Sequence, residues 1–215
     1  MSLSPHRPKA APRTGIEARR ERQRQEARRA ILDATESLLA ESAGGDFSIR
    51  GLADKCGYSA PTVYYHFGDK DGLMSALLED GMQTLAAELA HSCAAPDPLD
   101  RLRSMLIAFI HYSTENPIFS ALWWNVSRQP GNEMPPSFEQ VRERLDTTVT
   151  DLVASGRLRD HDKTRAEQTL WVLLHGLVGL QNAEPDHPWA PGLAESAIDN
   201  LLRGMTVDPA AEIAR

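Results

Sequence analysis

The chain has few cysteines, no long apolar run and no signal-peptide-like start. Cys56 and Cys93 are its two cysteines, and their spacing suits neither a disulfide framework nor a zinc pattern, so we expect free thiols. The longest nearly apolar run, Leu170 to Leu180, is interrupted by His175 and is too short to cross a bilayer. The first residues lack the apolar core of a signal peptide. These absences predict a cytoplasmic protein without a membrane partner.

Short catalytic motifs are absent as well. The sequence contains no glycine-rich phosphate loop, no Gly-x-Ser-x-Gly turn and no His-Glu-x-x-His element. His91 and Cys93 form a short pair of a metal-liganding type, and His111 is a candidate third group, but no recognised metal-site spacing results. We therefore expect no enzyme, no cofactor and no metal site.

The net charge of −7 is divided unevenly along the chain. Residues 1–70 hold 12 Lys and Arg against 9 Asp and Glu, whereas residues 71–215 hold 11 against 21. Within residues 1–30 there are 9 basic residues and 3 acidic ones. This separation indicates that the N-terminal part meets an anion and the rest does not. The alternative is an arginine-rich helix that is simply solvated.

The apolar residues follow helical spacing throughout, and no segment has the pattern of a strand, so the expected fold is all-α. Residues 1–15 are basic and rich in Pro and Ala, which is typical of a disordered arm. We expect an N-terminal helix-turn-helix DNA-binding domain over residues 25–85 and a larger helical domain for effector binding and dimerisation over residues 86–215. Long helices are expected over about 16–42, 138–154, 163–182 and 193–203, with others starting after Asp69, Pro98 and Asn116.

The segment from Ser48 to Phe67 predicts two short helices joined by a tight turn. One apolar face of the first helix is formed by Ile49, Leu52, Ala53 and Cys56. Gly57 stands where a helix ends in a left-handed residue, which glycine adopts without steric cost. Ser59 is a good N-cap for the second helix, and Pro61 fits its first turn.

In the second of these helices, Val63 and Phe67 are expected to point inward with Leu52. Thr62, Tyr65 and His66 then face outward, with Tyr64 near the edge. A helix-turn-helix of this kind places its second helix in the DNA major groove.

Residues 47–78 resemble the DNA-binding domain of the tetracycline-repressor-like (TetR) family. The resemblance is carried by the following residues: Ser48, Ile49, Leu52, Ala53, Gly57, Thr62, Val63, Tyr64, Tyr65, His66, Phe67, Lys70 and Leu73. Gly51 departs from the family, which often has a longer polar residue there. Trp171, His175 and Gly176 resemble the Trp-x-x-x-His-Gly element of one C-terminal subgroup.

The resemblance implies a homodimeric regulator, usually a repressor, in which a small ligand moves the fourth helix and releases a palindromic operator. Most of the candidate DNA-binding residues lie in the helix-turn-helix: Ser48, Arg50, Ser59, Ala60, Pro61, Thr62, Tyr64, Tyr65, His66 and Lys70. Arg19, Arg20, Arg22 and Arg24 are candidates for a minor groove or flanking phosphates. Two local alternatives remain open, in which Tyr64 packs against neighbouring helices and His66 caps or packs locally.

An aromatic and thioether set in the C-terminal part suggests a largely apolar or aromatic effector. The candidate ligand-binding residues are Met105, Phe109, Tyr112, Phe119, Trp123, Trp124, Asn125, Trp171, His175 and Gln181. The alternative is ordinary core, because cores use the same residue types.

The last two long helices are the candidate dimer interface, since a helix that is apolar on more than one face needs more than one partner surface. The residues concerned are Leu170, Leu173, Leu174, Leu177, Leu180, Ile198, Leu201 and Leu202. A buried central helix in a monomer is the alternative. The alternative functions are an effector-independent architectural DNA-binding protein and an enzyme on a TetR-like scaffold.

Overall fold

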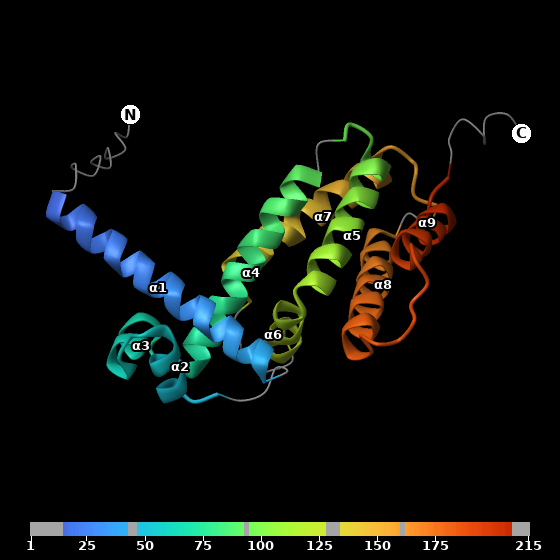
Figure 1. Ribbon diagram of the computed structural model, residues 1–215. Coiled ribbons are helices and arrows are strands. Elements are labelled where there is room, and N and C mark those ends of the chain that lie inside the picture. Colours follow the sequence, from blue (N-terminus) through green and yellow to red (C-terminus); the bar gives the residue numbers. More distant parts are fainter. Residues whose placement is uncertain (1–14, 43–46, 93–94, 128–133, 160–161, 208–215) are drawn as a thin grey trace, which may run out of the picture. The chain divides into compact units, whose positions relative to one another are not determined.

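The computed structural model describes residues 15–42, 47–92, 95–127, 134–159 and 162–207. Over these residues the chain is helical, with one isolated antiparallel bridge between Leu158 and Thr206, so the all-α expectation is confirmed. Figure 1 shows the described helices in chain order: α1 (Gly15–Glu41), α2 (Ile49–Cys56), α3 (Ala60–Phe67), α4 (Lys70–Ser92), α5 (Pro98–Glu115), α6 (Pro117–Ser127), α7 (Pro136–Ala154), α8 (Lys163–Ala183) and α9 (Leu193–Met205).

The chain divides into two compact units, Met1–Lys70 and Asp71–Arg215. The sequence analysis placed a boundary after residue 85, whereas nearly all of α4 belongs to the second unit. The reason is that Met82 and Leu85 of α4 line a cavity together with residues of α5, α6, α7 and α8. The expected disordered arm over residues 1–15 lies outside the described residues except for Gly15, the first residue of α1.

Local caps define the two short helices of the first unit. The Ser48 hydroxyl accepts a hydrogen bond from the Gly51 amide at 3.0 Å, and the Ser59 hydroxyl accepts one from the Thr62 amide at 3.3 Å. Gly57 ends α2 at φ +73°, a conformation that costs glycine little and other residues more.

Apolar residues between these helices form the core of the first unit. Leu52 and Val63 are buried, as expected. Phe67 was expected in the core but is only half-buried, and the Arg28 guanidinium lies 5.0 Å from the centre of its ring. The exposed part of the ring is thus packed against a charged side chain instead of core.

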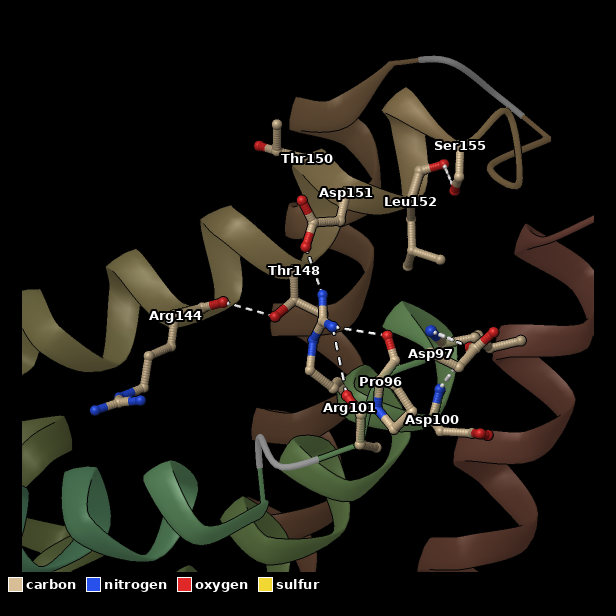
Figure 2. Close-up of polar contacts among 12 residues, drawn as sticks. Pro96, Asp97, Asp100, Arg101, Arg144, Thr148, Thr150, Asp151, Leu152 and Ser155 are labelled. Carbon is tan, nitrogen blue, oxygen red and sulfur yellow. Dashed lines mark hydrogen bonds and ion pairs between the residues drawn. The ribbon is translucent and has the colours of Figure 1, made fainter.

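In the second unit, α5, α7, α8 and α9 surround one hydrophobic core. Its fully buried side chains include Leu106, Leu152, Leu170 and Ile198. A cluster of polar contacts fixes the start of α5, where the Asp97 carboxylate accepts hydrogen bonds from the Leu99 and Asp100 amides at 2.7 and 3.2 Å (Figure 2).

Arg101 ties this start of α5 to α7. Its guanidinium donates to the Pro96 carbonyl at 3.1 Å and forms an ion pair with Asp151 of α7 (Figure 2). The Arg101 side chain is largely buried, so the pair is shielded from solvent more than a surface pair. Asp97 also pairs with Arg157, which follows α7 in the chain.

We expect Arg101→Ala to destabilise the protein by about 1–2 kcal/mol, because it leaves Asp151 and the Pro96 carbonyl without their donor. Urea unfolding followed by circular dichroism measures the change. Arg142→Ala is the matched control, since it removes an exposed ion pair within one helix, with Glu139, and should cost under about 0.5 kcal/mol. Equal losses in the two variants would contradict this assignment.

Candidate nucleic-acid interface and effector cavity

The exposed side of α3 carries the side chains expected to face DNA. Tyr65 is 73% exposed, Tyr64 is also exposed, and Thr62 and His66 are half-buried. A groove of about 710 Å³ runs between α3 and α1 within the first unit. Thr62, Tyr65 and His66 line it together with Arg20 and Arg24, so the structure brings these five predicted residues to one surface.

The lining of this groove includes the acidic side chains of Glu17 and Glu21 beside the two arginines, and the imidazole of His66. Burial lowers the pKa of His66 most, and the nearby charges of Arg24 and Arg28 lower this pKa further. His66 is therefore uncharged at neutral pH and offers both a donor and an acceptor. Its ring meets Tyr65 edge to face at 5.3 Å, and the Arg24 guanidinium lies 6.0 Å from the Tyr65 ring centre.

Several other predicted DNA-binding residues already have structural roles. Ser48 and Ser59 cap their helices, and the Ser59 hydroxyl lies 2.8 Å from the Thr62 hydroxyl. The Lys70 ammonium donates to the Phe47 carbonyl at 2.8 Å and lies 4.4 Å from the centre of the Phe47 ring. These contacts orient the side chains, and an additional role toward phosphates stays a prediction.

The remaining predicted residues of this unit lie outside the groove. Arg19 and Arg22 are exposed on α1, Arg50 is exposed on α2, Pro61 is exposed at the start of α3, and Ala60 is half-buried beside it.

The second unit contains a cavity of about 40 Å³. Six of the ten predicted ligand-binding residues line it: Phe109, Phe119, Trp123, Trp124, Trp171 and His175. The remaining lining residues were missed by the sequence analysis: Met82, Leu85, Ser113, Ser120, Phe138, Val141 and Val178. The apolar residues of this set lie in stripes with helical spacing, and such stripes predict only that the residues are buried. Nothing in the sequence distinguishes Ser113 and Ser120 from the other serines of the chain.

His175 of α8 lies at the centre of the aromatic wall. The Trp123 indole N–H donates to His175 Nε2 at 3.2 Å. Trp171 stacks on the imidazole with a centroid distance of 4.0 Å and an interplanar angle of 26°, and Phe109 stacks at 5.6 Å and 20°. Burial lowers the pKa of His175 to about 4, against a smaller opposing effect of the Trp171 carbonyl, so the ring is uncharged at neutral pH.

Four predicted ligand-binding residues do not line the cavity. Met105 is buried, and its sulfur accepts a hydrogen bond from the Thr148 hydroxyl at 3.6 Å. Tyr112 lies behind the cavity wall and meets Phe119 edge to face at 5.2 Å. Asn125 is exposed and Gln181 is half-buried.

Helix α4 contacts this wall very closely at Gly81. A Cβ atom added to Gly81 would lie 2.6 Å from Cδ2 of Phe119, so only glycine permits the observed approach. The Tyr112 hydroxyl donates to the Gly81 carbonyl at 2.8 Å. Two residues before Gly81, the Glu79 carboxylate accepts hydrogen bonds from the Ser137 hydroxyl at 2.6 Å and from the Ser137 amide at 3.1 Å. These contacts link α4 to α5, α6 and the start of α7.

The predicted dimer-interface residues fall into two groups. Leu170, Leu174, Ile198 and Leu202 are buried in the core of this unit and have no surface to offer a partner, which corrects their assignment. Leu173, Leu177 and Leu201 are half-buried, and Leu180 is 54% exposed. Val172, which the sequence analysis did not single out, is 71% exposed on α8.

No group of three or more His, Cys, Asp and Glu side chains among the described residues is placed to hold a metal ion. His111 lies 3.4 Å from Glu195 of α9, and Cys93 is outside the described residues. Within the described part of the chain, no helix is long and apolar enough to cross a membrane.

Comparison with known proteins shows a match to a protein family in the N-terminal part of the chain. Residues 31–77 match the model described as bacterial regulatory proteins, tetR family. The HTH-type transcriptional regulator BetI of Stenotrophomonas maltophilia is 29% identical over 114 residues, which are 52% of this chain and 55% of that protein, so the match spans about half the length of this relative.

Two further similarities extend over most of the chain. The HTH-type transcriptional regulator BetI of Paraburkholderia phytofirmans is 28% identical over 191 residues, covering 82% of this chain and 94% of that protein. A solved structure of a protein with unknown function from Rhodococcus sp. RHA1 has a TM-score of 0.71 at 25% identity, covering 84% of this chain and 96% of that one.

The family match covers the C-terminal part of α1 from Ile31 onward, all of the helix-turn-helix and the first third of α4, and so includes the caps and the exposed face of α3. The likeness of Trp171, His175 and Gly176 to a C-terminal subgroup stays a prediction. Residues 31–77 are therefore a sequence of the tetR type of bacterial regulatory proteins, and the chain is similar over most of its length to an HTH-type transcriptional regulator.

Proposed function

We propose that the chain is a ligand-responsive transcriptional repressor that binds a palindromic operator as a homodimer and is released by a small, largely apolar or aromatic effector. The observation that carries this proposal is the presence of two separate features in one chain. One is the groove at the exposed face of α3, which Arg20 and Arg24 border, and the other is the aromatic cavity in the second unit.

At the DNA, Thr62, Tyr65 and the uncharged His66 offer hydroxyl, phenol and imidazole groups to base edges in the major groove. Arg20 and Arg24 border the same groove and are suited to phosphates, which position a protein without reading sequence. Arg50, exposed on α2, is a further base or phosphate contact.

Dimerisation is assigned to the exposed apolar side of α8. Val172 and Leu180 are separated by two turns on one side of this helix, and Leu173, Leu177 and Leu201 are only partly covered. A twofold pair would present two α3 helices to half-sites about 34–36 Å apart or a multiple of that distance.

Coupling between effector and DNA is assigned to α4. A six-membered ring needs a cavity of roughly 150 Å³, more than the about 40 Å³ between these side chains. A ring that enters must therefore displace part of the wall, and Phe119 has no room to move toward Gly81 without shifting α4. Because α4 follows the helix-turn-helix directly in the chain, this shift alters how the paired α3 helices are held. Linkage then requires that DNA weakens effector binding by the same factor.

Tyr65→Ala should weaken operator binding by about tenfold or more, because it removes a highly exposed side chain from the face assigned to the bases. The operator is first selected from random duplexes, and affinity is then measured by fluorescence anisotropy. Glu36→Ala, an exposed change on α1, is the control and should leave the affinity unchanged. Wild-type affinity of the Tyr65 variant at an unchanged melting temperature would refute the assignment of this face.

Arg20→Gln and Arg24→Gln should each reduce the salt dependence of operator binding. Removing one phosphate contact from each subunit lowers the slope of log K against log salt by about 2 per dimer. Titrations at several salt concentrations measure this slope. Arg142→Gln, an exposed change in the second unit, should leave it unaltered, and an unaltered slope in the two α1 variants would place these arginines away from phosphates.

Val172→Asp combined with Leu180→Asp should convert the dimer to a monomer, because each change places a charge on the apolar surface assigned to the subunit contact. Sedimentation velocity measures the mass in solution. Ala121→Asp, at an exposed position of α6, is the control and should remain dimeric. A wild-type protein that sediments as a monomer would remove the dimer from the proposal.

A further inference from the structure

Two polar atoms in the cavity wall have no hydrogen-bond partner among the described residues. They are the Ser113 hydroxyl and His175 Nδ1. Ser113 is 1% exposed and His175 is 9% exposed, so water at the protein surface does not satisfy these atoms. Buried polar groups without a partner are rare in folded proteins and each calls for an explanation. Both residues line the same cavity, which gives the two atoms a common explanation.

The hydrogen bond from Trp123 determines which polar group His175 offers. An indole nitrogen only donates, so His175 Nε2 must be the acceptor and carries no proton. In the uncharged ring the proton therefore resides on Nδ1. Nδ1–H is a donor, and a bound molecule must bring an acceptor to it. The Trp171 carbonyl one turn earlier raises the pKa of the ring against the larger effect of burial, and Nδ1 has no partner within hydrogen-bond geometry among the described residues.

The remaining wall excludes charge and favours a flat shape. No lining residue carries a formal charge, because burial keeps His175 uncharged at neutral pH, so an ionised ligand would lose its hydration without a counter-charge. Besides His175, six aromatic side chains line the cavity: Phe109, Phe119, Trp123, Trp124, Phe138 and Trp171. Aromatic side chains favour contacts with another flat, π-bearing ring over a puckered one.

We infer that this cavity binds an uncharged, planar aromatic molecule carrying one oxygen acceptor, which accepts a hydrogen bond from His175 Nδ1–H and pairs with the Ser113 hydroxyl. The inference rests on the proposed function, in which this cavity receives the effector. It narrows the effector from a broadly apolar molecule to an aromatic ketone, aldehyde, amide or phenol.

Four small probes test separately the three properties that the inference requires of the ligand: an aromatic ring, the absence of charge and an oxygen acceptor. Acetophenone is planar and uncharged and carries a carbonyl acceptor, and ethylbenzene has a similar shape without the oxygen. Benzoate is planar but ionised, and cyclohexyl methyl ketone keeps the carbonyl without the aromatic ring. Binding to the full-length wild-type protein is followed by tryptophan fluorescence, since Trp123 and Trp171 lie in the wall, and by thermal shift.

Acetophenone is expected to bind about tenfold or more tightly than each of the other three probes, because a site with an unpaired buried donor rejects analogues that lack the acceptor. His175→Phe keeps an aromatic ring and removes the donor, so the preference over ethylbenzene should disappear. Ser113→Ala should reduce the preference while leaving the melting temperature unchanged or higher, since its hydroxyl has no partner to lose among the described residues.

Three results would overturn the inference. They are equal binding of ethylbenzene and acetophenone, tighter binding of benzoate, and no binding of any probe at millimolar concentration. Persistence of the preference in both variants would also overturn it. Operator affinity measured with and without each probe keeps the proposed function separate. Acetophenone that binds with the expected preference but does not release DNA contradicts the effector response alone, whereas release by a charged compound contradicts the inference alone.

Discussion

The hydrogen bond from the Trp123 indole to His175 Nε2 is the constraint on which the second unit's interior depends. It joins α6 to α8 in surroundings that are otherwise almost wholly apolar, where a hydrogen bond is strong and an unpaired polar group is costly. It also holds the imidazole in one tautomer between the rings of Trp171 and Phe109. This one hydrogen bond therefore determines both the position of the aromatic wall and the donor, Nδ1–H of His175, that the wall carries.

The packing of this wall also determines how a displacement of its side chains affects α4. Phe119 lines the cavity beside Met82 and Leu85 of α4, and its contact with Gly81 leaves no space for even one added carbon. The Tyr112 hydroxyl bonds to the Gly81 carbonyl from behind, and Glu79 holds the start of α7. Packed contacts of this kind resist gradual deformation, so a displaced ring is accommodated by a shift of a whole helix more readily than by local compression.

The sequence was sufficient for the helix-turn-helix because its determinants are local. The Ser59 cap and the left-handed Gly57 act within a few residues, and each was found where the sequence predicts it. The cavity was predicted only in part, since its wall is assembled from five helices. Nothing near Ser113 in the chain indicates that it lines the same cavity as His175. The interface assignment failed at Leu170 and Ile198 because an apolar helix does not reveal which face the chain itself covers.

The uneven distribution of charge along the chain limits how the exposed face of α3 and the cavity can act together. The first 70 residues are net basic and the remaining 145 carry almost twice as many acidic as basic residues. A duplex carries about one negative charge per 1.7 Å, so it is attracted to the first unit and repelled by the second. The cavity lies wholly in the acidic part. In the proposed repressor the effector and the DNA therefore bind to different units, and α4 is the direct covalent connection from the helix-turn-helix to the cavity.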